Sequence, residues 1–246
     1  MIANADLLVA NEGLPIHVLS GPDMMARAMK EFSPGLARGD ANLNNSPNHG
    51  CSHAADHRLL VPVMDATGRH RFTVLAKAHQ ADICNSIPTT DHRSAVDVYQ
   101  KGAPIFPSVQ VQKDFQTNAD FLRMCRMRIR VPGQWRGDFL AMLGAARIGE
   151  QEIAAMAADL GWDRLAEFSA GWLDYSERRM TDAIRALPAG TARRSSTHDP
   201  FAGTPASGIP VIAAVTIDPA AARIAVDLTD NINCLPCGLN PIPQRC

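Results

Sequence analysis

The sequence lacks an apolar run near the ~20 residues that a membrane-spanning helix needs, which argues against an integral membrane protein. It also lacks an excess of either charge, because the formal net charge is −1 over 246 residues. Proteins that bind nucleic acid or anionic membranes through electrostatics carry a clear positive excess, so the composition supports neither class. The first residues have no basic segment before an apolar one, which argues against a signal peptide and favours the cytoplasm.

Two phosphate-binding motifs are missing as well. There is no Gly-x-x-x-x-Gly-Lys-Ser/Thr loop and no Gly-x-Gly-x-x-Gly after a strand-like run, so a complete nucleotide site is not visible. The cysteines are too scattered to form a disulfide framework, and we expect free thiols. The six positions are Cys51, Cys84, Cys125, Cys234, Cys237 and Cys246.

The composition that is present is that of a globular protein, with 46% apolar and 20% charged residues. Strand-like runs come first, helical periodicity follows, and strand-like runs return, which predicts an α+β fold of β-hairpins or mixed sheet with a central helical segment. We expect one domain, with a strand and loop part over residues 1–115, a helical part over 116–190 and a C-terminal hairpin over 191–246.

The helices and strands are predicted from periodicity and end signals. Helices are expected over about 20–32, starting at the capping residue Ser20, and over about 118–130, 135–160 and 163–187. Thr117-Asn118-Ala119-Asp120 resembles a capping box. Strands are expected within 1–19 and 109–112 and in a hairpin of 211–215 with 224–228. Loops are expected over 33–52 and 191–208.

A first hairpin is predicted over residues 59–64 and 72–76, because two β-type apolar runs flank the turn residues 65–68. If Ala66 and Thr67 form the loop, paired residue numbers sum to 133. His79 then lies opposite Ala54, and Lys77 lies opposite Asp56.

This register brings His53, Asp56 and His79 to the open end of the hairpin, where facing Cα atoms are ~4.5–5.5 Å apart. Two imidazoles and a carboxylate suit a divalent metal with positions left open for substrate. The alternative is that these are solvated residues at strand ends. The choice of ligands is not unique either, because other histidines lie nearby. These are His49, His57 and His70.

A long stretch with few structure signals follows over residues 83–108. A structureless segment of this length in a compact domain is often functional. It starts beside the candidate ligands, so we expect it to face the substrate, with a surface crossover as the alternative. Its candidate substrate-contacting residues are Asn85, Ser86, Thr89 and Thr90.

Several motifs in one order resemble the hydantoinase B/oxoprolinase family. They are Asn-Asn-Ser-Pro at 44–47, Gly-Cys-Ser-His-Ala-Ala-Asp-His at 50–57, Lys-Ala-His-Gln-Ala-Asp at 77–82, Arg-Ile-Arg-Val-Pro at 128–132, Ala-Arg-Ile-Gly-Glu at 146–150 and Asp-Tyr-Ser-Glu-Arg-Arg-Met at 174–180. The resemblance covers about residues 4–240. The chain departs from it at Gln80, where the family commonly has a second His, and it looks truncated at both ends.

The resemblance implies a subunit, or a fragment of one, of an ATP-dependent hydrolase that opens hydantoin, 5-oxoproline or lactam rings. In carboxylase relatives a His-x-x-Asp pair and a later His hold a metal, and His53, Asp56 and His79 match these positions. The metal, Mn or Zn, would polarise the amide carbonyl or activate a nucleophile. Asp82 would orient a ligand or act as a fourth one. No catalytic residue is assigned.

The resemblance also implies a hydantoinase A-type partner that supplies ATP and Mg and phosphorylates the amide oxygen of the substrate. Two alternatives remain open. One is a subunit of an ATP-dependent ketone carboxylase, which forms a C–C bond. The other is an inactive fragment that keeps only metal- or partner-binding capacity.

Overall fold

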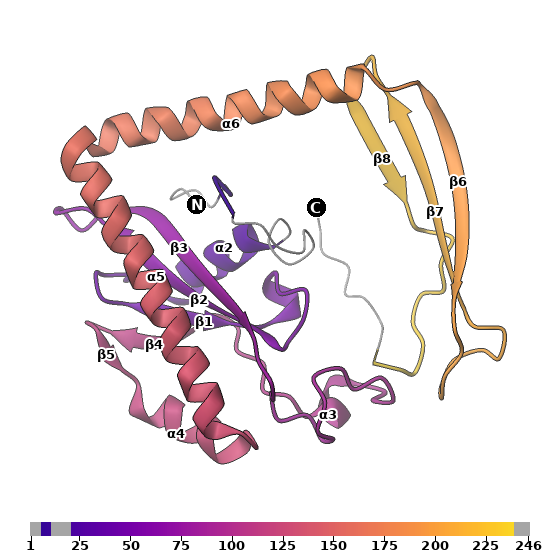
Figure 1. Cartoon of the computed structure of the whole chain (residues 1–246), viewed down its shortest axis with the longest axis horizontal. Coiled ribbons are helices and arrows are strands. Elements are labelled where there is room, and N and C mark those ends of the chain that lie inside the picture. The colour runs from indigo at the N-terminus through magenta and orange to yellow at the C-terminus, as the bar shows by residue number, and fades with distance from the viewer. Residues whose placement is uncertain (1–5, 11–20, 239–246) are drawn as a thin grey trace. The chain divides into compact units, whose positions relative to one another are not determined.

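The computed structural model of the chain describes residues 6–10 and 21–238, in which helices and antiparallel sheets confirm the predicted α+β class (Figure 1). The described residues form two compact units. Unit 1 holds those up to Asp91 and those of Gly102–Ser169, and unit 2 holds those of His92–Lys101 and from Ala170 onward.

Unit 1 is built on a five-stranded antiparallel sheet in the order β3-β2-β1-β4-β5. β2 contains a run of Leu and Val residues interrupted by one Pro, and its burial is nearly continuous because both faces of the sheet are covered. The strands are β1 (Ala41–Asn44), β2 (Asp56–Met64), β3 (His70–His79), β4 (Val109–Lys113) and β5 (Gln116–Thr117).

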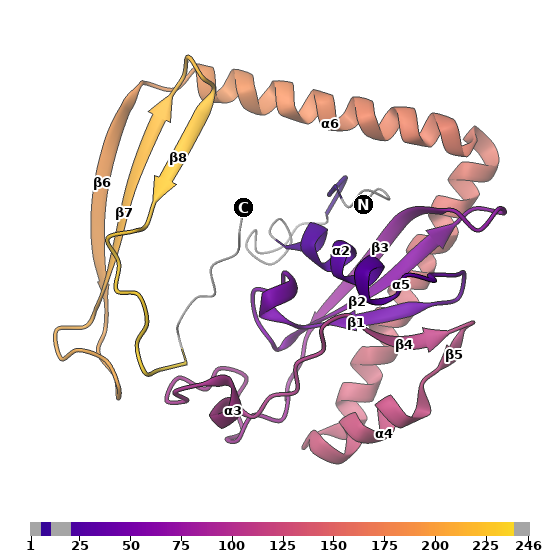
Figure 2. The same cartoon turned by 180° about the vertical axis from the view of Figure 1, so that it is seen from behind.

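Alternation along β2 sends neighbouring side chains to opposite faces of the sheet. Leu60 packs with Met25 and Met29 of α2 (Pro22–Phe32), whereas Leu59 and Val61 pack towards α5 (Pro132–Leu160). α5 crosses in front of the sheet in Figure 1, and α2 lies in front of it in the reverse view of Figure 2. The sheet is therefore the middle layer of unit 1.

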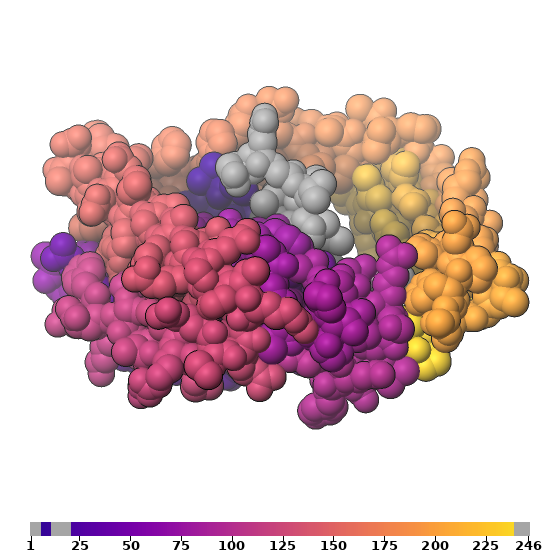
Figure 3. Space-filling view, turned by 60° about the horizontal axis from the view of Figure 1, so that its bottom comes forward, coloured from indigo at the N-terminus to yellow at the C-terminus, as the bar shows by residue number. Residues whose placement is uncertain are grey.

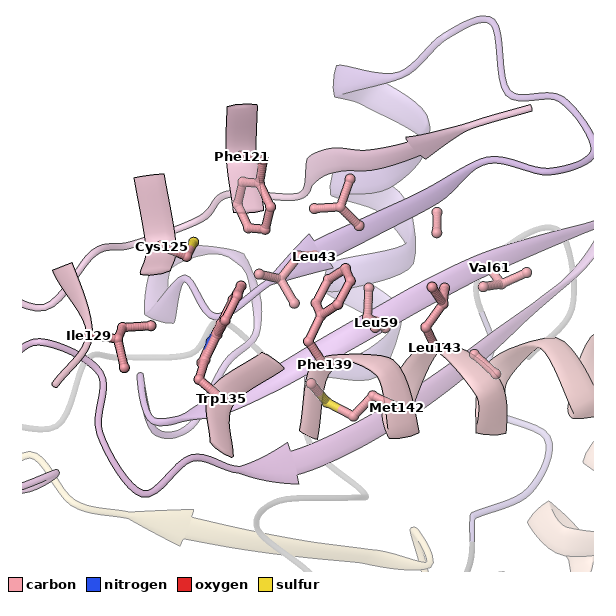
Figure 4. Close-up of a cluster of buried hydrophobic side chains, with 13 residues drawn as sticks. Leu43, Leu59, Val61, Phe121, Cys125, Ile129, Trp135, Phe139, Met142 and Leu143 are labelled. Carbon is pink, nitrogen blue, oxygen red and sulfur yellow. The ribbon is translucent and has the colours of Figure 1, made fainter. Parts of the chain in front are cut away.

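The largest core cluster fills the layer between the sheet and α4 (Ala119–Arg128) and α5. In Figure 4 the side chains from the sheet, α4 and α5 point toward one another. Trp135 and Phe139 stack with ring centroids 5.6 Å apart. Burying such large aromatic side chains stabilises the fold by about 1.5–3 kcal/mol each.

The start of α4 differs by one residue from the capping box that the residue pattern suggests. Asn118, not Thr117, is the N-cap, and its side chain accepts hydrogen bonds from the backbone N–H groups of Asp120 and Phe121, both 3.0 Å long. Asn is at least as good an N-cap as Thr, because its short amide reaches the same unpaired donors.

Arg147 ties α5 to the sheet at the start of β1 and the end of β4. Its guanidinium donates to the carbonyl oxygens of Gly39 and Asp40, to Gln112 Oε1 and to Glu150 Oε2, at 2.7–3.0 Å. The outer surfaces of α4 and α5 form the pink-to-red part of the space-filling view in Figure 3. On the inner side, a Cβ at Gly149 would lie 2.8 Å from Val74 Cγ1, so helix and strand approach closely there.

The β2–β3 hairpin is present, but its predicted register is wrong by two residues. His79 faces Asp56 rather than Ala54, and Lys77 faces Arg58 rather than Asp56. The cause is a wider turn, in which Asp65 Oδ1 accepts from the N–H groups of Thr67 and Arg69, together with a bulge between Val63 and Met64. A shift of two residues keeps every side chain on its expected face.

Unit 2 contains most of α6 (Trp162–Arg185), the short α3 (Val98–Lys101) and a three-stranded antiparallel sheet in the order β6-β7-β8. β7 (Ile209–Asp218) and β8 (Arg223–Asp227) confirm the second predicted hairpin. The loop predicted over 191–208 is wrong, because β6 (Gly190–His198) pairs with β7 along its whole length. All residues of β6 are exposed, so its sequence has no apolar alternation that would predict a strand.

The loop predicted over 33–52 is wrong in its middle, because β1 lies within it; this four-residue strand is buried on both faces and half of it is Asn, so it shows no apolar alternation. The other expectations fall at the ends of the chain. Residues 6–10 form no strand, but Leu7 and Leu8 pack against buried clusters of unit 1. The predicted cap Ser20, most of the strand predicted within 1–19, and Cys246 lie outside the described residues. Cys51, Cys84, Cys125 and Cys234 are free thiols, as expected. No helix in the described part of the chain is long and apolar enough to cross a membrane.

Candidate functional site

The Asn-Asn-Ser-Pro motif folds the loop that leads into β2. Asn45 Nδ2 donates to the carbonyl oxygens of Ala54 and Pro104, at 2.8 and 3.0 Å, and its Oδ1 accepts from Phe106 N–H. Asn44 closes the same loop by binding Ser46 N–H and the carbonyl oxygen of His49. Both asparagines are fully buried, so the motif fixes the backbone that carries the candidate ligands.

Close glycine contact anchors this loop to α2. A Cβ on Gly21 would lie 1.9 Å from the carbonyl oxygen of Gly50, and one on Gly50 would lie 2.2 Å from that of Gly21. Both residues also have positive φ, which other residues rarely adopt. The Gly-Cys-Ser-His segment therefore starts at a fixed point beside the N-terminus of α2.

His79 and Asp56 form a direct pair at the open end of the hairpin. His79 Nδ1 and Asp56 Oδ1 are 2.9 Å apart, and the two residues face each other in the strand register. When Nδ1 donates to the carboxylate, Nε2 carries a free lone pair, which is the usual state of a metal-binding histidine. The imidazole of His79 is half-exposed, so that lone pair is accessible.

Asp56 is also bound by Lys77, whose Nζ lies 3.0 Å from Oδ2. The side chain of Asp56 is only 2% exposed, and that of Lys77 is 22% exposed. Both carboxylate oxygens therefore have a partner in this structure, and a metal ion that bound Asp56 would compete with Lys77 and His79.

His53 lies beside His79, with ring centroids 5.3 Å apart. Its Nδ1 is 3.0 Å from the N–H of Ala55 and accepts that hydrogen bond, so the proton of the neutral ring is on Nε2. Binding a metal through either nitrogen of His53 requires this local contact to change. The donor types of His53, Asp56 and His79 fit a divalent metal, but their present arrangement does not form a closed site.

The rest of the described residues also lack a formed metal site. Within residues 6–10 and 21–238, no group of three or more His, Cys, Asp or Glu side chains is placed to hold a metal ion. The metal assignment to His53, Asp56 and His79 thus stays a prediction, and its closest approach to a formed site is the His79–Asp56 pair.

The other histidines of this stretch form hydrogen bonds with residues outside the His79–Asp56 pair. His57 points to the opposite face of β2, where it accepts a hydrogen bond from Trp135 Nε1 at 3.4 Å, and burial lowers its pKa to about 4. His49 Nδ1 binds Ser46 Oγ, and His70 Nε2 binds Thr73 Oγ1 near the turn. Strand alternation alone excludes His57 as a partner of Asp56.

Asp82 is held away from the pair by Arg130. Its Oδ2 accepts from the backbone N–H of Arg130 at 2.6 Å, and its Oδ1 accepts from the guanidinium at 2.8 Å. Arg130 also donates to the carbonyl oxygen of Asn85 at 2.6 Å. Sequence spacing missed this contact because the partners lie 48 residues apart. Arg130 therefore fixes the start of the stretch predicted to face substrate.

The predicted substrate residues differ in accessibility. Asn85 is buried, its Nδ2 donates to the carbonyl oxygen of Thr89, and its Oδ1 has no hydrogen-bond partner among the described residues. Ser86 is exposed, and Thr89 and Thr90 are half-buried. Exposure favours Ser86 and Thr90 for contact with a ligand, whereas the hydroxyl of Thr89 already hydrogen-bonds to the backbone of Asp91. Asn85 has a role in shaping the loop.

Cys51 and Arg58 lie on the same face of the sheet as Asp56. Cys51 Sγ donates to the carbonyl oxygen of His53 at 2.9 Å, and burial raises the pKa of this thiol despite the opposing effect of Arg58. A raised pKa argues against an activated nucleophile. Arg58 is completely buried beside Met25, and burial lowers its pKa. Sequence patterns assign no role to Arg58 or Lys77.

Comparison with known proteins shows which family and which solved structures this chain resembles. The pattern of the hydantoinase B/oxoprolinase family matches residues 1–245. The B-type subunit of a putative D-/L-hydantoinase from Pseudomonas sp. (strain NS671) is 33% identical over 163 residues, which are 66% of this chain and 27% of that protein.

Two solved structures share the fold. The ATP-dependent caprolactamase from Pseudomonas jessenii matches with a TM-score of 0.77 at 23% identity, over 92% of this chain and 38% of that one. The nucleotide-free acetone carboxylase matches with a TM-score of 0.73 at 18% identity, over 85% of this chain and 28% of that one. The chain thus spans well under half the length of these relatives.

Proposed function

Because the chain belongs to the hydantoinase B/oxoprolinase family, we propose that it acts as the B-type subunit, or part of one, in an ATP-dependent hydrolase of cyclic amides. The observation that carries this proposal is the family match over residues 1–245 together with the hydantoinase relative. The substrate would be a hydantoin, 5-oxoproline or a lactam, and the enzyme would work in the cytoplasm.

The proposed metal ligands are His53, Asp56 and His79. Support comes from the His79–Asp56 contact, which leaves Nε2 of His79 as a lone-pair donor, and from His53 beside it. Mn or Zn bound there would polarise a substrate carbonyl or lower the pKa of a bound water. Asp82 has no direct part in this proposal, because its carboxylate is bound to Arg130.

The protein residues themselves would position the substrate. Ser86 and Thr90 offer hydroxyl groups on the segment that Arg130 fixes through Asn85. Thr89 would join them if its hydroxyl left the backbone of Asp91. Hydroxyl groups can donate to an amide oxygen and accept from an amide N–H. Asn45 binds the carbonyl oxygen of Ala54, shortly before Asp56, and so keeps the ligand-bearing strand in place.

ATP and Mg would come through a hydantoinase A-type partner. The support is that the sequence contains neither of the two phosphate-binding motifs, together with the naming of the hydantoinase relative as one subunit of its enzyme. The partner would phosphorylate the amide oxygen, which makes the ring easier to open.

A ketone carboxylase is the second candidate, favoured by the fold shared with acetone carboxylase. It would draw on the same three proposed ligands but form a C–C bond. The two candidates differ in what they consume, since only the carboxylase needs bicarbonate and a ketone.

The test is reconstitution. The chain is co-expressed with a hydantoinase A-type protein from the same genome and assayed for ATP-dependent loss of hydantoin, 5-oxoproline and caprolactam. The same mixture is assayed for ATP-dependent uptake of labelled bicarbonate with acetone. Ring opening supports the hydrolase, and labelled carboxylate supports the carboxylase. If none of these compounds is converted and none of them stimulates ATP hydrolysis, both candidates are contradicted.

The metal proposal has its own readout. Metal analysis of the purified chain after Mn or Zn supplementation should give about one equivalent, and His79→Ala should lose most of it. His70→Ala is the matched control, because it removes an imidazole at the far end of the same strand. Wild-type protein without stoichiometric metal, or equal losses in the two variants, contradicts the assignment.

A further inference from the structure

An open cleft in unit 1 lies between the loop that follows α2 and the segment that leads into β4. Its volume is about 660 Å³, and the residues that line it belong to 32–40 and 107–114. The cleft begins beside the first residues of β1, where Asn42 pairs with Leu60, whereas Asp56 lies at the far end of β2. It is therefore separate from the candidate metal ligands.

Asp40 lines this cleft and is only 2% exposed. Its Oδ2 accepts from the backbone N–H of Ala37 at 3.0 Å, but its Oδ1 has no hydrogen-bond partner among the described residues. Arg147 lies nearby, yet its guanidinium donates to the backbone carbonyl of Asp40, to Gln112 and to Glu150. A buried carboxylate oxygen without a donor is unfavourable, so Asp40 offers a strong acceptor at the cleft.

Two further residues leave acceptors without donors at the same place. Ser108 also lines the cleft, is 2% exposed, and its Oγ has no partner among the described residues. Asn42 Nδ2 joins the two walls by donating to Ser33 Oγ and to the carbonyl oxygen of Ser108, both at 2.9 Å, while its own Oδ1 has no such partner. The polar groups around the cleft thus accept fewer hydrogen bonds than they could, and a fitting ligand has to donate.

The backbone around the cleft is held in an uncommon conformation. Ser108, Asp114 and Phe115 have φ values of 54°, 48° and 60°, and they are three of the five described residues other than glycine with positive φ. Gly39 packs against the same turn, because a Cβ on it would lie 2.7 Å from Phe115 N. Such conformations persist only where the surrounding structure enforces them, so the shape of the cleft is fixed in advance.

The charged side chains that line the cleft are balanced in sign. Arg38 and Lys113 are exposed cations, exposed Asp114 carries a negative charge, and Asp40 supplies a buried carboxyl group. The guanidinium of Arg38 lies over the ring of Phe115, with its central carbon 5.6 Å from the ring centre, which favours a defined position for its planar donors. This set of groups suits a ligand that carries both charges and has no net charge.

We propose that the cleft binds a small molecule with a primary ammonium group and a carboxylate, such as an amino acid. The ammonium group has three donors, which Asp40 Oδ1 and Ser108 Oγ would accept, and Arg38 would bind the carboxylate. Because Oδ1 is now shielded, binding turns the Asp40 carboxylate towards the cleft and weakens its hydrogen bond with Ala37. This site is additional to the proposed hydrolase function and does not depend on it.

A cleft that only holds water gives different expectations. If water alone satisfies Asp40 and Ser108, compounds with an ammonium group should not saturate the cleft. Removing the charge of Asp40 should then change no binding isotherm. The amide signal of Ala37 separates the two cases, because its N–H donates directly to the Asp40 carboxylate.

The experiment follows the Ala37 amide of the 246-residue chain by NMR during titration with glycine, 4-aminobutanoate and 6-aminohexanoate. Butylamine and butyrate each carry only one of the two charged groups. The variants are Asp40→Asn, which keeps an acceptor for Ala37, Arg38→Gln, and Ser108→Gly. Asp159→Asn is the control, because it makes the same change at an exposed position of α5. Circular dichroism verifies that each variant is folded.

We expect at least one of the three amino acids to shift the Ala37 signal in a saturable way. Asp40→Asn should weaken this binding about tenfold, as for a lost hydrogen bond to a charged group. Ser108→Gly should weaken it severalfold and should fold well, since glycine adopts φ of 54° readily. Arg38→Gln should weaken it about threefold, the size of an exposed ion pair, and leave butylamine unaffected. Asp159→Asn should bind as the wild type does.

Three outcomes would overturn the proposal. The first is that none of the three amino acids gives a saturable shift. The second is that Asp40→Asn binds as tightly as Asp159→Asn or, where Asp40→Asn does not fold, that Ser108→Gly binds as tightly as the wild type. The third is that butylamine binds as tightly as the amino acids, which would remove the carboxylate from the ligand. None of these measurements depends on ring opening or bound metal, so the proposed function can fail separately.

Discussion

The two sheets of this chain have similar strands in opposite surroundings. In unit 1, eight of the nine residues of β2 are buried, whereas in unit 2 all nine residues of β6 are exposed. Both strands are paired along their full length. Hydrogen-bonded pairing therefore defines a strand in either unit, but only unit 1 adds a core that makes the sheet stable by itself.

The two long helices repeat this difference. α5 buries seven residues, including Trp135 and Phe139, whereas the buried residues of α6 are Leu165 and Ser169, both in its unit 1 part. Further along α6, apolar side chains such as Trp172 and Met180 are 44% and 62% exposed. Stability should therefore be concentrated in unit 1, which substitutions in the two units can test.

The largest effect is expected at Trp135, which is 1% exposed in the main core. Trp135→Ala leaves a large cavity and should lower the free energy of unfolding by about 3–5 kcal/mol. Urea denaturation followed by circular dichroism measures it. Trp135→Phe should lose less, since it keeps an aromatic ring. A loss below about 1 kcal/mol for the alanine variant would mean that unit 1 is not the stable part.

The next effect is expected at Arg147, which joins α5 to the sheet beside β1 and β4. Arg147→Leu removes four hydrogen bonds and leaves Glu150 buried without its cation, so we expect a loss of about 3 kcal/mol. Arg136→Leu is the control, because it removes the same charge from an exposed position of the same helix and should change stability by at most about 0.5 kcal/mol. Equal losses would contradict the anchoring role.

Alanine substitutions at two glycines of α5 should change the unfolding free energy by smaller amounts, and in opposite directions. Gly144→Ala meets no atom within 4 Å and should stabilise the helix by up to about 1 kcal/mol. Gly149→Ala places its Cβ 2.8 Å from Val74 Cγ1, and overpacking of about 1–3 kcal/mol should outweigh the same helical gain. Thermal unfolding of both variants provides the comparison, and stabilisation by both would show that α5 and β3 are not closely packed.

The smallest effect is expected on the sheet of unit 2. Val226 is 59% exposed, so Val226→Ala should change the unfolding free energy by no more than about 0.5 kcal/mol. Hydrogen exchange should also be faster in β6–β8 than in β1–β4, because few apolar contacts protect these strands. A loss above about 2 kcal/mol, or equal protection, would remove the contrast between the sheets.

The elements that sequence patterns predict well are those whose burial produces a pattern. The core helices and both hairpins carry apolar periodicity, and they appear close to the expected bounds. The pattern of β6 predicts a loop, because a strand exposed on both faces has no such periodicity. The predicted hairpin register is wrong because side-chain hydrogen bonds of Asp65 widen the turn, which residue types at 65–68 do not specify.

The sequence predicts which residues form the candidate site better than it predicts how they are arranged. Spacing places His79 near Asp56 and His53, and the structure brings His79 into contact with Asp56. Spacing cannot reveal that Asp82 binds Arg130, since that contact joins distant segments of the chain. The metal-binding role of these residues remains a prediction.

The contact between Trp135 and His57 has a further consequence. The indole N–H reaches His57, the residue directly after Asp56, from the opposite side of the sheet. Trp135 is almost completely shielded from water, whereas Trp172 is 44% exposed. The most blue-shifted part of the intrinsic fluorescence should therefore come from Trp135, since the third tryptophan, Trp162, is only partly buried. Its emission offers a label-free optical signal for any displacement of the strand that carries Asp56.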